Sequence, residues 1–435
     1  MPDRLIIKGG KKLKGEIDVR GSKNAATPMI AATLLAEEGV SKITNLPLIA
    51  DVYKMIRLIE SLGAKVDWCG DRSIEVNAEN IDPNKLDQNL VAQMRSSILV
   101  MGPLIARFGE LSIRHPGGCL IGARPIDTHL NGLRDLGVNI ETEEFGADES
   151  TDAETKKSHM YHLEAAELKG KEVVLDEFSV TGTENMLMAS ALAEGRTNLK
   201  IAAAEPHVQN LAHFLNKMGA NIEIDGNNTY QIEGQKSLHG VEHRVIPDYL
   251  EAGTFIVLGL AAEGEILIKD VPEDHLDLTI SRLKKFGGDI EKVEDGILKV
   301  RGSNMNIPEI QAMPYPGIPT DLQSPLGVLA TQAEGLTLIH DPMYEGRLKY
   351  LEELNKMGAE IVMCDPHRAI INGPTNLHGT KLDPLDLRSG AALIIAGIIA
   401  DGVTIIKDVS QADRGYEEIE KRLRRIGVDV KRIKE

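Results

Sequence analysis

One sequence pattern recurs six times along the chain: an apolar helical segment, then a short polar stretch that ends in glycine, then a strand rich in β-branched residues. A second glycine follows each first one after 23 to 28 positions. Successive first glycines are 70, 86, 69, 71 and 67 residues apart, and a period of this size marks a repeat architecture. The first glycines are Gly39, Gly109, Gly195, Gly264, Gly335 and Gly402, and the second are Gly63, Gly137, Gly219, Gly287, Gly358 and Gly427.

Each repeat predicts the element order β-α-β-α-β-β. The leading helix ends at the first glycine, which adopts the left-handed conformation without a Cβ clash. A second, amphipathic helix follows, as in "ADVYKMIRLIESLG", where Val52, Ile56 and Ile59 share one face. Six such units predict an α/β protein, either a linear solenoid or two globular domains of three units each. The longest spacing marks an insertion, and its acidic, polar residues 143–160 predict a surface loop or disorder.

The formal net charge of −17 argues against nucleic acid and anionic lipid as general partners. Cys69, Cys119 and Cys364 are far apart and form no CxxC, so neither a disulfide framework nor a cysteine zinc site is indicated. The twelve histidines show no ligand spacing, and we expect no metal and no cofactor. No signal peptide is evident, and the longest apolar run, residues 390–400, is too short to span a bilayer. These features favour a cytoplasmic protein.

The start of each leading helix carries charged or polar residues. Asp248, Asp321 and Asp386 suit the first turn of a helix, and we expect them to cap free backbone N–H groups. Lys23 and Arg95 are unexpected at this position, because the positive end of the helix dipole opposes them. Helix N-termini combined with Lys and Arg form anion sites, so these positions predict binding of a phosphate or carboxylate.

Cys119 lies in "RHPGGCLIGARP", directly after a Pro-Gly-Gly turn. Such a turn offers a thiol no core to pack into, which favours a reactive role. A thiol has a reference pKa of about 8.5, so it can donate a proton near neutral pH and also act as a nucleophile. Cys69 and Cys364 are interpreted as inert buried or incidental surface thiols.

Several motifs, in the correct order, resemble the UDP-N-acetylglucosamine 1-carboxyvinyltransferases, enolpyruvyl transferases that open peptidoglycan synthesis. The similarity runs from about Gly9 to Glu435 and is weakest over residues 143–172. The sister enolpyruvylshikimate-phosphate synthases begin with a Gly-Asp-Lys-Ser type motif where this chain has Gly21-Ser22-Lys23-Asn24. The motifs are "GSKNA", "RPIDTHLNGLRDLG", "SVTGTEN", "PYPGIPTDLQSPL", "YEGRLKYLEELNKMGA", "DLRSGAALIIAG" and "DRGYEEIEKRLRRIG".

The resemblance implies an inside-out α/β barrel of two domains, with three β-α-β-α-β-β repeats in each. One domain spans residues 23–242, the other combines residues 1–22 with 243–435, and the active site lies in the cleft between them. The implied reaction moves the enolpyruvyl group of phosphoenolpyruvate onto the 3′-hydroxyl of UDP-N-acetylglucosamine and releases phosphate. Both substrates are small molecules, and the resemblance implies no cofactor; the oligomeric state is not predicted.

The resemblance also assigns residues. Cys119 matches the proton donor, which can bond covalently to phosphoenolpyruvate and is the target of fosfomycin-type epoxides. Asp321 matches the base that takes the hydroxyl proton. The remaining matches are Lys23, Arg124 and Arg414 for phosphoenolpyruvate; Asn24 for the sugar and the reacting carbon; Pro125, Ile126, Asp127 and Thr128, with Arg124, for uridine; Ser179 and Val180 near the diphosphate; and Arg95, Met343, Arg347, Asp386 and Arg388 as further substrate-binding residues.

The chain departs from the family pattern near the diphosphate segment. Thr181-Gly182 stand where many members have Gly-Ala, and Glu177 stands where some have a basic residue. Two other hypotheses remain open on the sequence. The same fold could use another acceptor, such as a shikimate-like compound or another nucleotide sugar, or the chain could be a non-catalytic repeat scaffold. The joint presence of Lys23, Cys119, Asp321 and Arg414 argues against a scaffold, because binding alone needs no proton donor.

Overall fold

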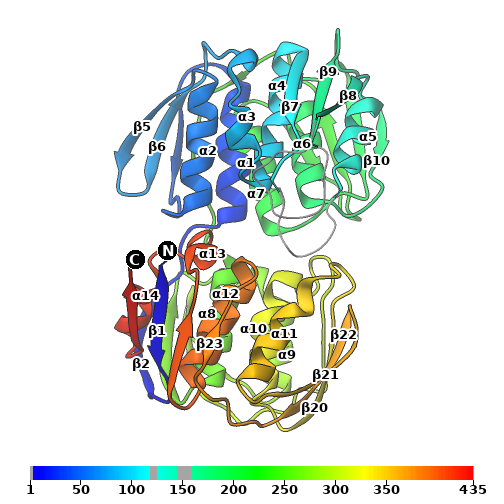
Figure 1. Ribbon diagram of the computed structural model, residues 1–435. Helices are drawn as coiled ribbons and strands as arrows, with labels where there is room; N and C mark the ends of the chain where they lie inside the picture. Colours follow the sequence, from blue (N-terminus) through cyan, green and yellow to red (C-terminus); the bar gives the residue numbers. More distant parts are fainter. Residues whose placement is uncertain (1–2, 118–124, 146–157, 435) are drawn as a thin grey trace. The chain divides into compact units, whose positions relative to one another are not determined.

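The chain folds into two compact units, each with its own hydrophobic core (Figure 1). Of the described residues, the central unit contains 21–117, 125–145 and 158–246, and the terminal unit combines residues 3–20 with 247–434. The chain therefore passes from one unit to the other after Arg20 and returns after Ile246.

The computed structural model describes all residues except 1–2, 118–124, 146–157 and 435. No helix among the described residues is long and apolar enough to cross a membrane.

The central unit contains the first three repeats. Its helices are α1 (Lys23–Ala32), η1 (Thr33–Leu35), α2 (Ala50–Ser61), η2 (Pro83–Lys85), α3 (Gln88–Val91), η3 (Arg95–Val100), α4 (Met101–Phe108), α5 (Asp127–Asp135), α6 (Val180–Ser190) and α7 (Pro206–Lys217). Its strands are β3 (Ala36–Glu38), β4 (Ser41–Thr44), β5 (Lys65–Gly70), β6 (Ser73–Asn77), β7 (Glu110–Arg114), β8 (Asn139–Phe145), β9 (Ser158–Glu164), β10 (Glu172–Val174), β11 (Arg196–Lys200), β12 (Asn221–Ile224), β13 (Tyr230–Glu233), β14 (Leu238–His239) and β15 (Glu242–Arg244).

The terminal unit contains the other three repeats. Its helices are α8 (Tyr249–Ala261), η4 (Glu273–His275), α9 (Asp277–Lys285), α10 (Thr320–Ala330), η5 (Arg347–Lys349), α11 (Tyr350–Lys356), α12 (Leu387–Ile399), α13 (Ser410–Asp413) and α14 (Ile419–Arg425). Its strands are β1 (Arg4–Lys8), β2 (Leu13–Asp18), β16 (Gly264–Lys269), β17 (Asp289–Glu294), β18 (Ile297–Arg301), β19 (Glu309–Gln311), β20 (Gly335–His340), β21 (Glu360–Asp365), β22 (Arg368–Gly373), β23 (Lys381–Leu382), β24 (Val403–Ile406) and β25 (Asp429–Ile433).

One sheet pattern accounts for the predicted repeat. In the described part of the chain, five four-stranded sheets each consist of a parallel pair followed by two antiparallel strands; β15-β4-β6-β5 is an example. A sixth sheet, β7-β9-β8, has only the antiparallel part, and a short pairing of β3 with β14 accompanies them. Three of the six repeated sheets lie in each unit. The two-domain arrangement with three repeats per domain is therefore confirmed, and the linear solenoid is excluded.

The leading helix of each repeat lies inside its unit. Helices α8, α10 and α12 pack against one another in the terminal unit, and nearly every residue of α8 and α12 is buried. A helix that is apolar on all sides needs such a position, because it has no face suited to water. The sheets cover these helices from outside, which is the inside-out barrel (Figure 1).

The N-terminal strands complete two repeats of the terminal unit. Strand β1 inserts between β24 and β25, so the sixth repeat closes only with residues from the start of the chain. Strand β2 pairs in parallel with β16 of the fourth repeat. Gly264 begins β16 with φ of 116°, and a Cβ there would lie 2.0 Å from the carbonyl oxygen of Leu13. All twelve repeat glycines have positive φ. The second glycine of each repeat and Gly109 directly follow a helix or its C-cap, as predicted. The prediction that the leading helix ends at the first glycine was wrong at the other five positions: Gly39 follows strand β3, and the remaining four lie three to five residues beyond the end of the helix.

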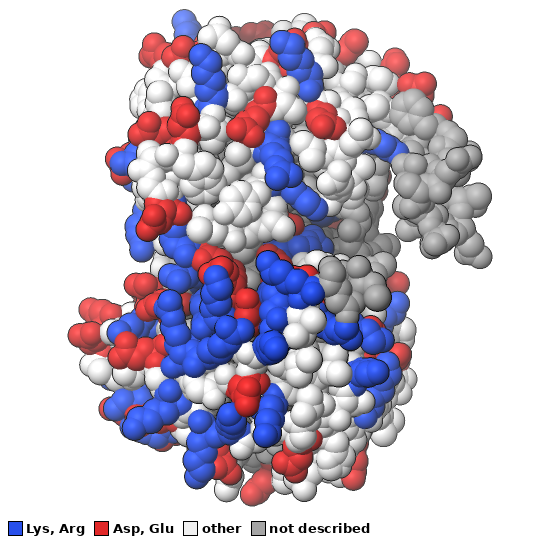
Figure 2. Space-filling view, turned by 60° about the vertical axis from the view of Figure 1, so that its left-hand side comes forward, with Lys and Arg blue, Asp and Glu red and all other residues white. Residues whose placement is uncertain are grey.

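The surface charge is mixed rather than uniformly acidic. On the face drawn in Figure 2, Lys and Arg are interspersed with Asp and Glu, and basic side chains are numerous over the terminal unit. A protein of net charge −17 can therefore still present cations locally to an anionic ligand.

Candidate active site

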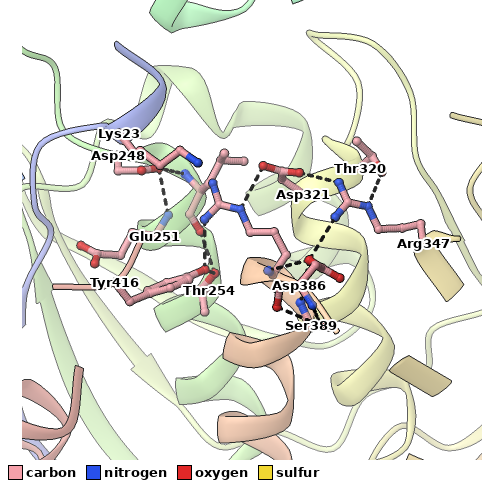
Figure 3. Close-up of polar contacts among 12 residues, drawn as sticks. Lys23, Asp248, Glu251, Thr254, Thr320, Asp321, Arg347, Asp386, Ser389 and Tyr416 are labelled. Atoms are coloured by element: carbon pink, nitrogen blue, oxygen red, sulfur yellow. Dashed lines mark hydrogen bonds and ion pairs between the residues drawn. The ribbon is translucent and has the colours of Figure 1, made fainter. Parts of the chain in front are cut away.

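The carboxylate of Asp321 lies between two buried guanidinium groups in the terminal unit (Figure 3). Arg347 Nη2 is 2.6 Å from Asp321 Oδ1, and Arg388 Nε is 2.9 Å from Oδ2. Both arginine side chains are 3 % exposed, whereas that of Asp321 is 26 % exposed. The two fixed cations hold the carboxylate in place, and part of it remains exposed.

Arg347 is held by groups on three sides. Its Nε donates to the hydroxyl of Thr320 at 3.2 Å, and its Nη1 lies 3.6 Å from Asp386 Oδ1. Burial lowers the pKa of Arg347, but Asp321, Asp386 and Asp341 together outweigh burial, and the net shift is upward. The guanidinium is therefore a permanent charge, and it fixes the orientation of Asp321.

Asp386 caps α12 and also faces Arg347. Its Oδ1 accepts from the backbone N–H groups of Arg388 at 2.8 Å and Ser389 at 3.3 Å, and the Ser389 hydroxyl accepts from the Asp386 N–H at 2.9 Å. This reciprocal pair is a capping box, which sets where α12 begins. The start of α12 thereby places the Arg388 side chain against Asp321.

A chain of hydrogen bonds continues from Arg388 through Tyr416. Arg388 Nη1 donates to the Tyr416 hydroxyl at 3.3 Å, and its guanidinium lies 5.7 Å from the centre of that ring. The Thr254 hydroxyl donates to the Leu250 carbonyl at 2.8 Å and lies 2.9 Å from the Tyr416 hydroxyl. Since the Thr254 proton is already used, Tyr416 donates to Thr254 and accepts from Arg388. Burial raises the pKa of Tyr416, which keeps the phenol protonated in this chain.

Two other predicted residues of the terminal unit lie on loops and helix ends. Arg414 follows α13 directly as its C-cap and is half-buried. The backbone N–H of Met343 donates to Asp341 Oδ1 at 3.0 Å, and the Met343 side chain is exposed.

Lys23 begins α1 of the central unit. Ser22 precedes it as the N-cap and accepts from the backbone N–H of Ala25 at 3.4 Å. Lys23 Nζ lies 3.2 Å from Oδ2 of the buried Asp51 in the first turn of α2, which offsets the dipole penalty that the sequence predicts. Asn24 follows and is half-buried.

Arg95 positions the segment predicted to bind uridine. Its Nη2 donates to the Pro125 carbonyl at 3.0 Å, and the Arg95 side chain is largely buried. Ile126 is buried, and α5 begins at the exposed Asp127. The hydroxyl of Thr128 donates to Glu177 Oε1 at 3.3 Å, so the acidic departure from the family pattern has a partner inside this segment.

Ser179 and Val180 form the N-terminus of α6. Ser179 is the N-cap, and its hydroxyl accepts from the Gly182 N–H at 3.2 Å; Val180 is the first helical residue. A Cβ on Gly182 would lie 3.0 Å from Ser179 Oγ, so glycine permits this tight first turn. Cys119 and Arg124 lie outside the described residues.

Comparisons with known proteins identify relatives over nearly the whole length of the chain. A sequence model described as EPSP synthase (3-phosphoshikimate 1-carboxyvinyltransferase) matches residues 7–423. A UDP-N-acetylglucosamine 1-carboxyvinyltransferase from Treponema denticola is 41 % identical over 433 residues, which covers 98 % of both chains. A protein of Carboxydothermus hydrogenoformans named UDP-N-acetylglucosamine 1-carboxyvinyltransferase 2 is also 41 % identical and covers 99 % of both. The chain belongs to the UDP-N-acetylglucosamine 1-carboxyvinyltransferase family.

Solved structures support the family's fold. The enolpyruvyl transferase NikO from Streptomyces tendae matches with a TM-score of 0.86 at 24 % identity, over 99 % of both chains. An EPSP synthase from Acinetobacter baumannii matches with a TM-score of 0.74 at 19 % identity, over 99 % of this chain and 100 % of that one. The enolpyruvyl transferase fold predicted from the sequence is therefore confirmed.

Helix capping by the family's acidic positions is confirmed at two of three sites. Asp248 accepts from the N–H groups of Leu250 at 2.8 Å and Glu251 at 3.1 Å, and Asp386 caps as described above. Asp321 lies in the first turn of α10, as predicted, but it is not the cap: Pro319 is the N-cap, and the Asp321 carboxylate binds the two arginines. Two buried cations attract a carboxylate more strongly than exposed N–H groups do.

Sequence reasoning missed two residues that support these family motifs. Tyr416 lies in the "DRGYEE" motif, and no local pattern indicates its contacts with α8 and α12. His129 Nδ1 lies 2.9 Å from the amide nitrogen of Asn185, which makes Nδ1 the acceptor and leaves the proton on Nε2 for Thr181, 3.1 Å away. Thr181, one of the residues that depart from the family pattern, thus has a hydrogen-bond partner in His129. Cys69 and Cys364 are exposed thiols, and the described residues contain no group of His, Cys, Asp and Glu that could hold a metal ion.

Proposed function

We propose that this protein transfers the enolpyruvyl group of phosphoenolpyruvate to the 3′-hydroxyl of UDP-N-acetylglucosamine and releases phosphate, the first committed step of peptidoglycan synthesis. One observation carries the proposal: relatives bearing this activity as their name are 41 % identical over 98 % or more of the chain. The geometry around Asp321 supports it, because a carboxylate held by two arginines and open on one side suits a general base for a bound hydroxyl.

The reaction is an addition followed by an elimination. Cys119 donates its thiol proton to C3 of phosphoenolpyruvate, and C2 becomes electrophilic. The 3′-oxygen then bonds to C2 while Asp321 takes the hydroxyl proton, which gives a tetrahedral adduct. The Cys119 thiolate then takes a proton from C3 while the C2–O bond to phosphate breaks, and Asp321 gives its proton to the departing phosphate. The double bond is thereby restored, now in the product.

Three cations hold the anionic substrate in this proposal. Lys23, Arg124 and Arg414 bind the phosphate and carboxylate of phosphoenolpyruvate, and Asn24 contacts the sugar and the tetrahedral carbon. Asp51 already neutralises part of the Lys23 charge, so the lysine is held in place before the substrate arrives. Pre-oriented charges of this kind stabilise an anion without the cost of reorganisation.

Asp321 is supported as the base by its surroundings. Arg347 and Arg388 hold both carboxylate oxygens at fixed positions, and Asp386 orders the start of α12 that carries Arg388. These contacts fix the orientation of the carboxylate. Orientation matters more to a general base than high basicity does, because the proton that it takes must lie within hydrogen-bond reach. Met343 completes the substrate contacts that we assign to the terminal unit.

The nucleotide is assigned to the central unit. We place uridine against residues 124–128, which Arg95 anchors through the Pro125 carbonyl, and the diphosphate near Ser179 and Val180 at the start of α6. The N-terminus of an eleven-residue helix suits an anion. The hydrogen bond from Thr128 to Glu177 directs the Glu177 carboxylate toward α5. This supports the view that an acidic residue at position 177 is compatible with diphosphate binding. The reaction needs no cofactor, and we place it in the cytoplasm, where both substrates are made.

The experiment that tests the proposal is phosphate release from phosphoenolpyruvate. We expect release that depends on UDP-N-acetylglucosamine and is absent when UDP-glucuronic acid or no acceptor is supplied. The Lys23→Met variant should lose most of the activity while its thermal unfolding stays close to that of the unaltered protein. Tight binding of both substrates without phosphate release would contradict the proposal.

A further inference from the structure

The turn that carries Arg414 is fixed by polar contacts on both sides, buried on one side and partly buried on the other. On the C-terminal side, Tyr416 is bound to α8 and α12. On the N-terminal side, Arg432 of β25 binds Asp413 with two parallel hydrogen bonds, Nη1 to Oδ2 and Nη2 to Oδ1, each 2.7 Å long. This fork geometry is the most directional way in which an arginine holds a carboxylate.

Arg432 joins β25 to α13, α14 and the residue that precedes β1 in the terminal unit. Besides Asp413, it binds Glu420 of α14 at 3.0 Å and approaches Asp3 to 3.5 Å, and its side chain is only 14 % exposed. Its hydrogen bonds to Asp413 and Glu420 raise its pKa, so it is always charged. The N–H of Val409, directly before α13, donates to the Asp3 carbonyl at 3.0 Å, so the start of α13 is tied to the same place.

The Asp413 carboxylate is adjacent in sequence to the arginine proposed to bind phosphoenolpyruvate. Arg432 occupies both oxygens of this carboxylate and balances its charge. Without Arg432, α13 would lose its bond to β25, and an unbalanced carboxylate next to Arg414 would compete with the substrate for that guanidinium. Both effects weaken binding of an anion at Arg414 and leave the nucleotide contacts unchanged.

We propose that Arg432 is a positioning residue for phosphoenolpyruvate: through Asp413 it fixes and electrically balances the turn that carries Arg414. This inference rests on the proposed function, from which it takes the assignment of Arg414. Arg432 itself is not proposed to touch the substrate.

The chain offers a matched control in Arg301. Arg301 lies on β18 of the same unit and also binds three carboxylates: Glu265 at 2.7 Å, Asp289 at 3.1 Å and Glu291 at 2.9 Å. None of these carboxylates adjoins a residue assigned to substrate. Loss of ion pairing with three carboxylates is common to Arg301→Met and Arg432→Met, whereas a positioning role for phosphoenolpyruvate affects Arg432→Met alone.

The experiment compares steady-state kinetics of Arg432→Met, Arg301→Met and Arg414→Met. We expect Arg432→Met to raise KM for phosphoenolpyruvate about tenfold, the effect of losing one charge-assisted contact, with kcat and KM for UDP-N-acetylglucosamine little changed. Arg432→Lys, which keeps the charge and one hydrogen bond, should show a smaller rise and serves as the test if Arg432→Met does not fold. Adding Asp413→Asn to Arg432→Met should lower KM again, because the unbalanced charge is removed.

The outcomes separate this inference from the proposed function. If the unaltered protein does not turn over, or Arg414→Met binds phosphoenolpyruvate normally by calorimetry, the assignment of Arg414 fails and the inference fails with it. If Arg414→Met weakens phosphoenolpyruvate binding while Arg432→Met and Arg432→Lys behave like Arg301→Met, only the positioning role of Arg432 is overturned.

Discussion

Replacing Asp321 by asparagine tests the proposed base with almost no change in volume. Asparagine keeps one oxygen acceptor but presents an NH₂ group to the second guanidinium. Arg347 retains Thr320 and Asp386 as partners, whereas Arg388 retains the Tyr416 hydroxyl. We therefore expect the amide oxygen to remain with one arginine while the other loses its charged acceptor.

Two magnitudes follow for Asp321→Asn. Loss of a positioned general base lowers kcat by about 10²–10⁴-fold. Loss of one hydrogen bond between buried charged groups lowers the free energy of unfolding by about 1.5–3 kcal/mol. The protein should therefore stay folded while turnover nearly stops, and KM for both substrates should change much less than kcat.

The assay is phosphate release at saturating concentrations of both substrates, combined with urea unfolding of the same preparations. Asp365→Asn is the control, because Asp365 also binds an arginine, Arg368 at 2.7 Å, but at the strand ends on either side of the turn between β21 and β22. That pair should contribute less than about 1 kcal/mol and leave kcat unchanged. A folded Asp321→Asn protein with kcat within about tenfold of the original would refute the role of Asp321 as base.

Three further predictions follow from other residues. Cys119→Ser should nearly abolish turnover, because a hydroxyl is a poor proton donor at neutral pH, and mass spectrometry should find a fosfomycin-type epoxide on Cys119 but none on Cys119→Asp; an unmodified thiol would count against its reactivity. Arg422→Met should lower the free energy of unfolding by about 3–5 kcal/mol, because Arg422 holds both oxygens of the buried Glu251 at 2.6 and 2.8 Å. The double variant Arg422→Met with Glu251→Leu should recover most of this loss. An Arg422→Met protein of normal stability would contradict the argument. Burial lowers the pKa of His243 to about 4 from 6.5, so the unfolded chain binds the proton more tightly than the folded protein does. Stability should therefore fall as pH drops through this interval, by at most about 3 kcal/mol. His243→Gln should flatten that part of the pH profile of urea unfolding, and an unchanged profile would exclude the histidine as its source.

The repeat spacing predicted the elements well because each repeat is locally encoded. The glycine at every repeat position adopts positive φ, and the second glycine of each repeat does so directly after a helix, as local sequence predicts. Closure into two domains was not encoded locally. It depends on β1 pairing with β24 and β25 across nearly the whole chain, and on β2 pairing with β16. A pattern within one repeat carries no information about such partners.

The candidate site was predictable only where a motif identified its members. Local context alone gave Asp321 the role of a helix cap, whereas its contacts come from η5 and α12, far away in sequence. Tyr416 and Arg432 carry no local signal at all, because their importance arises from the turn between α13 and α14 and from its partners. Burial and long-range ion pairing decide these roles, and the spacing of residues records neither.

The most direct test of the central claim is a competition between acceptors, read by mass spectrometry. The protein would be incubated with phosphoenolpyruvate and equal amounts of UDP-N-acetylglucosamine and shikimate 3-phosphate. We predict that the nucleotide sugar alone gains the mass of one enolpyruvyl group, in step with phosphate release. Conversion of shikimate 3-phosphate instead, or phosphate release with neither acceptor modified, would contradict the account.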